Sequence, residues 1–179
     1  MSKPIAPYVS IIMPIYNRSK WLPLITININ NLSYPKDKLE FVILDDSEGD
    51  PLLPTEEDIV ALQEKIKPVS LKYIRDNNRK SIGAKRNKLV KLSTHKIIAC
   101  MDSDDLYSPS YLTHSINIMN EGNFNIVGSN QMLFVYPTQD MFDNWVITGI
   151  QCAERRMIHE ATMLFNKKYF KAMGGFANC

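Results

Sequence analysis

The sequence predicts an α/β protein of a single domain, in which helices flank a mostly parallel β-sheet. The first observation behind this prediction is that short apolar segments, rich in Val and Ile, alternate four times with segments of helical period. Such alternation is typical of right-handed βαβ units, whose strands run parallel. The second observation is that the chain has 179 residues, of which 45% are hydrophobic and 22% charged. These values match one globular domain and exclude a disordered or fibrous chain.

The predicted strands are apolar runs, often of β-branched residues, bounded by polar or turn-forming residues. In chain order they cover residues 9–15, 39–44, 69–74 and 96–101, then one or two strands within 124–134, and finally 160–165. Short apolar runs of this kind are expected where a strand is buried on both faces of a parallel sheet.

The predicted helices cover residues 20–30, 55–67, 81–92, 108–120 and 167–173. Ser19 is the expected N-cap of the first helix. Thr55 and Asp58 have the spacing of a capping box at the start of the second. Pro109 is expected in the first turn of the fourth helix, and Gly174-Gly175 at the C-terminal cap of the last.

Charged and polar residues gather directly after the predicted strands. In a parallel α/β sheet, ligands bind beyond the carboxyl ends of the strands, and desolvated charges must be paired or metal-bound. We therefore expect a binding site there. Its candidate residues are Pro14, Tyr16, Asn17, Arg18, Asp45, Asp46, Lys85, Arg86, Asp102, Ser103 and Asp104.

Asp102 and Asp104 are the most specific of these candidates. Two carboxylates at positions i and i+2, in a turn after a buried strand, can converge on one hard divalent cation, either Mn²⁺ or Mg²⁺. The alternative is that the acidic residues cap the helix that begins near Pro109. The second acidic pair, Asp45-Asp46, follows another strand and favours the metal interpretation.

The other candidates each have a structural alternative. Asp45-Asp46 can close an Asx-turn, or accept a hydrogen bond from a uracil ring or a ribose hydroxyl. Lys85 and Arg86 can form a solvated helix face, or contact a diphosphate or a base. Tyr16 can pack at a helix start or stack on a base, and the sequence leaves these two possibilities open.

Several classes of protein are disfavoured by composition. A net charge of +2 does not indicate a nucleic-acid-binding protein. Three cysteines, Cys100, Cys152 and Cys179, have no CxxC spacing and argue against a disulfide framework or a zinc site. We find no signal-peptide pattern and no apolar stretch of transmembrane length, so we expect a cytoplasmic protein without a transmembrane segment.

Six segments together resemble family 2 of the GT-A glycosyltransferases, which are nucleotide-sugar-dependent, inverting enzymes. The resemblance runs from about residue 9 to residue 176, and each segment is weak alone, but their order and spacing match the family. The segments are VSIIMPIYNR (9–18), LDDSEGD (44–50), IGAKRN (82–87), MDSDDLYSP (101–109), EATMLF (160–165) and MGGF (173–176).

The resemblance implies transfer of a sugar from a nucleoside-diphosphate sugar, expected to be a UDP-sugar, to an acceptor hydroxyl with a divalent metal (EC 2.4 class). It implies roles for the candidate residues. Pro14, Tyr16, Asn17 and Arg18 border the nucleoside, Asp46 holds the uracil, and Asp45 supports the turn. Arg86 approaches the base or diphosphate, Asp102 and Ser103 lie near the ribose and diphosphate, and Asp104 is the main metal ligand. The acceptor is a glycan, a lipid or a protein.

The resemblance also divides the chain into a nucleotide-sugar-binding half, residues 1–107, and the start of an acceptor half, residues 108–179. The family's catalytic base is usually an acid shortly after the GGF turn, so we expect a chain cut short, or part of a larger protein. Within the chain, Glu160 is the candidate base and His159 a candidate metal or diphosphate contact, although this pair can equally be structural.

Two other functions remain as alternatives. One is a nucleotide-sugar-binding module without turnover, because the base lies beyond the chain end. The other is a sugar nucleotidyltransferase, which is disfavoured because residues 14–18 lack the Gly-rich loop that holds a triphosphate. A dehydrogenase is disfavoured because no GxGxxG follows any predicted strand.

Overall fold

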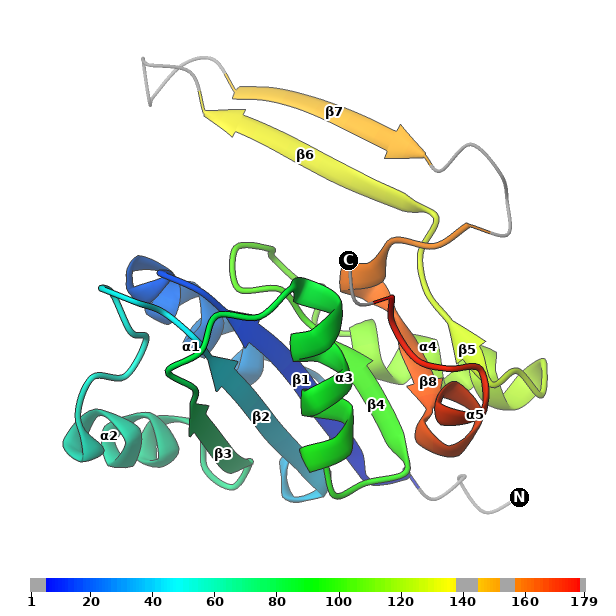
Figure 1. Cartoon of the computed structure of the whole chain (residues 1–179). Helices are drawn as coiled ribbons and strands as arrows, with labels where there is room; N and C mark the ends of the chain where they lie inside the picture. Colours follow the sequence, from blue (N-terminus) through cyan, green and yellow to red (C-terminus); the bar gives the residue numbers. More distant parts are fainter. Residues whose placement is uncertain (1–5, 138–144, 152–156, 178–179) are drawn as a thin grey trace.

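The computed structural model describes residues 6–137, 145–151 and 157–177 (Figure 1). Its main sheet has six strands in the order β3-β2-β1-β4-β8-β5, and β6 and β7 form a separate two-stranded sheet. The strands of the main sheet are β1 (Val9–Ile15), β2 (Leu39–Asp45), β3 (Ser70–Arg75), β4 (Ile97–Cys100), β5 (Ile126–Val127) and β8 (Leu164–Asn166). β1 to β4 run parallel, and β8 runs antiparallel to β4 and β5. The expected mostly parallel sheet is therefore confirmed.

The helices cover both faces of the main sheet. They are α1 (Leu22–Asn31), α2 (Glu56–Ile66), α3 (Ile82–Leu92), α4 (Tyr111–Glu121) and α5 (Lys167–Ala172), with short 3₁₀ turns η1 (Ser19–Trp21), η2 (Lys36–Lys38) and η3 (Glu160–Thr162). The apolar side chains of α1, α2 and α4 pack on one face of the sheet, where Ile29 and Ile11 belong to the same buried cluster. α3 and α5 cover the other face, where Leu89 and Phe170 join Ile12 (Figure 1).

Local sequence signals set several of the element ends as expected. Thr55 caps α2, and its reciprocal hydrogen bonds with Asp58 complete the capping box. Ser81 caps α3 by accepting a hydrogen bond from the Ala84 amide. Gly174 and Gly175 follow α5 with φ values of +92° and +78°, which side chains other than glycine's rarely tolerate.

Three expected boundaries are wrong. Ser19 does not cap α1: it lies in η1, and α1 begins at Leu22 because Pro23 favours the first turn of a helix. α4 begins at Tyr111, after a turn that contains Pro109. Residues 160–162 form η3 instead of the start of a strand, and β8 begins only at Leu164.

Residues 124–134 contain two strands that belong to different sheets. β5 adds to the main sheet, whereas β6 (Gln131–Pro137) pairs antiparallel with β7 (Trp145–Gln151), a strand that we did not predict. This hairpin projects away from the main sheet (Figure 1).

Among the described residues, no helix has the length and apolar character needed to cross a membrane. Cys100 is a buried free thiol, and burial raises its pKa to about 12. Cys152 and Cys179 lie outside the described residues.

Candidate donor-binding site

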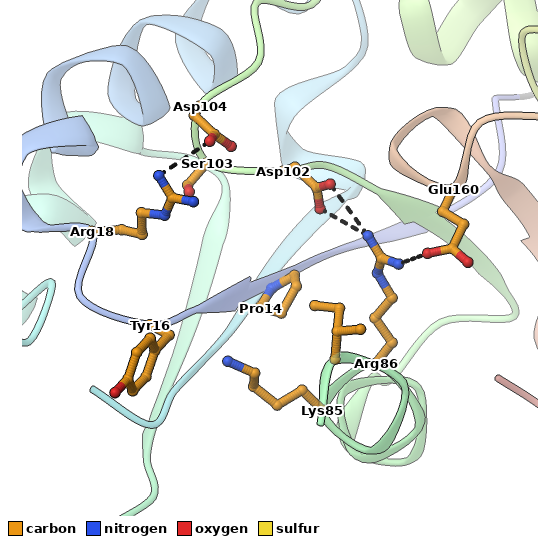
Figure 2. A pocket seen from close by; sticks show the side chains of 10 residues that line it. Pro14, Tyr16, Arg18, Lys85, Arg86, Asp102, Ser103, Asp104 and Glu160 are labelled. Carbon is orange, nitrogen blue, oxygen red and sulfur yellow. Dashed lines mark hydrogen bonds and ion pairs between the residues drawn. The ribbon is translucent and has the colours of Figure 1, made fainter. Parts of the chain in front are cut away.

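A pocket of about 320 Å³ lies where β1 and β4 end and α3 begins (Figure 2). Apart from Ile82, every residue that lines it is one that the sequence singled out. The lining consists of Pro14, Tyr16, Arg18, Ile82, Lys85, Arg86, Asp102, Ser103, Asp104 and Glu160. The expectation that polar residues after the parallel strands converge on one site agrees with this geometry.

Arg86 joins two acidic residues across one wall of the pocket (Figure 2). Its Nη2 lies 3.1 and 3.2 Å from the carboxylate oxygens of Asp102, and its Nη1 donates to Glu160. The residue is only 4% exposed. Burial lowers the pKa of Arg86, but the negative charges nearby, Asp102 foremost, raise it more, so the guanidinium stays charged.

Arg18 and Asp104 form a second ion pair on the opposite side of the pocket, with 3.2 Å between Nη1 and Oδ2 (Figure 2). Their side chains are 43% and 39% exposed. Unlike Arg86, this arginine is half-exposed to solvent. The carboxylates of Asp102 and Asp104 therefore each face an arginine, one buried and one accessible.

Lys85 lines the pocket and pairs with Asp46. Lys85 Nζ lies 2.6 Å from Asp46 Oδ1 and 3.0 Å from the carbonyl oxygen of Ile15. The second carboxylate oxygen of Asp46 accepts a hydrogen bond from the Lys80 amide at 2.7 Å. Asp46 is only 1% exposed and does not line the pocket. Both of its oxygens are thus engaged by the protein itself.

Asp45 holds the loop that follows β2. Its carboxylate accepts hydrogen bonds from Ser47, from the Leu52 amide and from the Tyr73 hydroxyl. Burial raises the pKa of Asp45, but these hydrogen bonds outweigh burial and lower it overall. Asp45 therefore holds the loop in place through its hydrogen bonds.

Tyr16 and Asn17 begin the loop that follows β1. The Tyr16 ring lies 4.5 Å beneath the Arg79 guanidinium, a cation–π distance. Asn17 has a φ of 51°, its amide donates to Ser47 Oγ at 2.7 Å, and its side chain does not line the pocket. Of the two, only Tyr16 therefore presents its side chain to the pocket.

Two residues that position the Asp102–Asp104 turn were missed by the sequence analysis. Asn28 donates to the Asp105 carbonyl at 2.7 Å and accepts from the Tyr107 amide at 3.0 Å. The Tyr107 hydroxyl accepts from the Asp102 amide at 2.8 Å and donates to the Ala161 carbonyl. The available signal was a polar residue on an apolar helix face, because Asn28 follows Ile25 by three positions.

Three carboxylates, those of Asp102, Asp104 and Asp105, stand close together in the acidic turn. Burial, and then the charges of Asp102 and Asp104, raise the pKa of Asp105. Within the part of the chain that the structure describes, no group of three or more His, Cys, Asp or Glu side chains could hold a metal ion. The protein can therefore supply two carboxylates, and further oxygen ligands must come from substrate or water.

His159 and Glu160 do not act as a pair. Glu160 reaches the pocket and binds Arg86, whereas His159 does not line it. The His159 amide donates to the Ser129 carbonyl at 2.9 Å. Its buried Nε2 has no hydrogen-bond partner among the described residues.

A larger pocket, of about 1180 Å³, adjoins the first one. It lies between α4 and residues 127–133, and the two pockets share Asp102 and Asp104. Among its described lining residues are Leu106, Tyr111, His114, Ile118 and Leu133, but no lysine or arginine.

Comparisons with known proteins agree on the family. Residues 10–176 match the family Glycosyl transferase family 2. Among curated proteins, the chain is 26% identical over 131 residues to glycosyltransferase AglE of Haloferax volcanii, covering 73% of this chain and 41% of AglE. It is 31% identical over 116 residues to an uncharacterised glycosyltransferase of Rickettsia conorii, covering 65% and 18% of the two chains. The chain thus spans less than half the length of these relatives.

Solved structures share the fold. A mannosyltransferase of Pyrobaculum calidifontis, in complex with GDP-Man and Mn²⁺, superposes with a TM-score of 0.73 at 19% identity, covering 98% of this chain and 49% of its own. S. aureus TarS 1–349 with UDP-GlcNAc gives a TM-score of 0.68 at 15% identity, covering 94% and 48%. The sheet and helices are therefore GT-A-like, as expected from the sequence. Because the family match extends over nearly the whole chain, the protein belongs to glycosyl transferase family 2.

Proposed function

We propose that this chain binds a nucleoside-diphosphate sugar, preferably a UDP-sugar, and transfers the sugar to an acceptor hydroxyl. The observation that carries the proposal is the pocket where β1, β4 and α3 meet, with three carboxylates and two arginines in its wall. Arginine forks bind phosphate oxygens in a bidentate manner, and carboxylates bind hard cations. Family membership and the donor complexes of the fold relatives support the same donor class.

The donor set of the pocket fits Mn²⁺ or Mg²⁺. Asp104 and Asp102 would hold the ion, because both line the pocket and offer the oxygen ligands that hard cations prefer. When bound, such an ion supplies positive charge to a departing diphosphate. The fold relative from Pyrobaculum calidifontis was solved with Mn²⁺.

The chain's own residues would perform the remaining work. Tyr16 borders the nucleoside, and Arg18 stands where it can contact the diphosphate. Arg86 fixes the carboxylate of Asp102, and Tyr107 and Asn28 fix the backbone on either side of the turn. The acceptor hydroxyl would attack the anomeric carbon from the side opposite the diphosphate while a general base removes its proton.

The larger pocket is our proposed acceptor side. It meets the donor pocket at Asp102 and Asp104, so a molecule bound there can reach the anomeric carbon. Its described lining includes acidic residues and aliphatic side chains but no lysine or arginine. This charge pattern favours an uncharged acceptor over a phosphorylated one.

The direct test is a donor screen. Purified protein with Mn²⁺ would be incubated with UDP-, GDP- and TDP-sugars, and release of the nucleoside diphosphate would be measured. We expect one donor to be hydrolysed or transferred, and Asp104→Asn to abolish the Mn²⁺ dependence. Nucleotide binding that is indifferent to both Mn²⁺ and Asp104→Asn would contradict the proposed metal site.

A second candidate function is donor binding without turnover. It is favoured by the contact between Glu160 and Arg86, because the contact engages the carboxylate with the protein's own guanidinium and not with an acceptor hydroxyl. Glu160→Gln separates the possibilities. If Glu160 is the base, the variant loses turnover by about a hundredfold or more with unchanged donor affinity. If the chain binds the donor but does not turn it over, calorimetry shows UDP binding, and no nucleoside diphosphate is released from any donor.

A further inference from the structure

We propose that Arg18 occupies the place of the metal ion at Asp104 in the donor-free protein. When metal and donor bind together, the guanidinium of Arg18 leaves Asp104 and moves to the donor diphosphate. This inference rests on the proposed function, since it presumes that Asp104 is a metal ligand. It adds that Arg18 makes the binding of metal and of donor mutually dependent.

The topology brings these two residues together. Arg18 follows β1 and Asp104 follows β4, and β1 and β4 are neighbours in the sheet. The loops after them therefore come together on one side of the donor pocket (Figure 2). The 3.2 Å contact between Arg18 Nη1 and Asp104 Oδ2 joins these loops.

The two arginines of the pocket differ in their freedom to move. Arg86 is bound to both Asp102 and Glu160, and its side chain is 5% exposed. Arg18 pairs with Asp104 alone among the ion pairs of the described residues, and its side chain is 43% exposed. Breaking the contacts of Arg86 would leave a buried guanidinium without partners, whereas water can solvate both Arg18 and Asp104 when they separate. Arg18 is therefore the arginine that can exchange partners.

The energies favour such an exchange. An exposed ion pair contributes little to stability, so a divalent ion can displace the guanidinium from Asp104 at small cost. The released guanidinium still lies in the wall of the donor pocket, where a diphosphate offers oxygens that match its planar fork. Metal thus frees the arginine that binds the donor. By linkage, the donor must tighten metal binding by the same factor.

The test measures Mn²⁺ binding directly. Loss of the free-ion electron paramagnetic resonance signal gives the Kd of Mn²⁺ without nucleotide, for the wild type, Arg18→Gln and Arg18→Lys. Lys20→Gln is the matched control, because it removes the same charge from the adjoining turn η1, and Lys20 forms no ion pair with Asp104 among the described residues. We expect Arg18→Gln to tighten Mn²⁺ binding about two- to fivefold more than Lys20→Gln does. Arg18→Lys, which keeps the charge, should lie nearer to the wild type.

The same titrations with saturating UDP or GDP complete the test. In the wild type the nucleotide should tighten Mn²⁺ binding, and in Arg18→Gln this coupling should shrink by at least threefold. The proposal is overturned if Arg18→Gln binds free Mn²⁺ no better than Lys20→Gln does, or if the coupling is unchanged. If Asp104→Asn binds Mn²⁺ as the wild type does, the proposed metal site fails as well. If the Arg18 effects hold but no donor turns over, only the proposed catalysis fails.

Discussion

Lys85 Nζ lies 2.6 Å from Asp46 Oδ1, and the two side chains are only 7% and 0% exposed. Lys85 belongs to α3, Asp46 follows β2, and the same ammonium donates to the carbonyl of Ile15 at the end of β1. One buried cation of the pocket lining therefore joins α3 to the ends of β1 and β2. Because both charges are buried, we expect their loss to affect stability first.

Replacing Lys85 should destabilise the fold. Lys85→Met leaves the Asp46 carboxylate buried without its cation, and we expect the free energy of unfolding to fall by about 3–5 kcal/mol. Lys67→Met is the control, because Lys67 pairs with Glu64 where both side chains are more than half exposed. Its cost should stay below about 1 kcal/mol. Urea denaturation measures both variants, and equal losses would contradict the prediction.

Replacing Arg86 by lysine should weaken donor binding. A lysine is a point charge and cannot hold Asp102 with two hydrogen bonds while donating to Glu160. We expect Arg86→Lys to weaken Mn²⁺-dependent UDP binding roughly ten- to a hundredfold, the range expected for losing hydrogen bonds to a charged group. Isothermal titration calorimetry gives the Kd. An unchanged Kd would show that the orientation of Asp102 does not matter for donor binding.

Asn28 should affect both the stability of the fold and the position of the Asp102–Asp104 turn. Asn28→Ala removes the donor to the Asp105 carbonyl and the acceptor for the Tyr107 amide, and we expect a loss of about 1–3 kcal/mol in unfolding free energy. The acidic turn should loosen as well, which weakens Mn²⁺ binding. The matched control on the same helix is Asn30→Ala, which removes one exposed contact to the Lys65 carbonyl. If both variants bind Mn²⁺ equally, Asn28 does not position the turn.

Glu40 should make stability depend on pH. Burial raises the pKa of Glu40, but hydrogen bonds from Ser10, Thr94 and Lys72 outweigh this and lower it from 4.5 to about 2. Because the folded pKa is the lower one, the stabilisation is complete above the unfolded pKa of 4.5 and is lost as pH falls towards 2. The difference corresponds to roughly 3 kcal/mol.

Unfolding free energies between about pH 6 and pH 3 test this prediction. Glu40→Gln should flatten the fall in stability over this range. Glu64→Gln is the control, since Glu64 is exposed and pairs with Lys67 on the surface, and it should keep the wild-type slope. A Glu40→Gln protein that loses stability with acid as steeply as the wild type would refute the role of Glu40.

Much of the fold could be predicted because its signals are local. The buried strands are recognisable in the sequence as short apolar runs. Thr55 and Ser81 cap their helices by hydrogen bonds to residues three positions further along the chain. The errors arose where another local preference prevailed. Pro23 moved the start of α1 away from Ser19, and a 3₁₀ turn replaced the first residues of an expected strand. Strand β7 was missed, although it pairs with β6.

By itself, the sequence determined the α/β class, the family and the set of residues that follow the parallel strands. It could do so because strand period and strand-end position are properties of neighbouring residues. Only the tertiary structure decided the partners: Arg18 with Asp104, Lys85 with Asp46, and Arg86 with both Asp102 and Glu160. Arg86 and Glu160 are 74 positions apart, and their contact depends on the order of the strands in the sheet and on the turn of η3. Because charges find partners through space, the sequence could name the charged residues but not which of them stays buried and which is free to exchange.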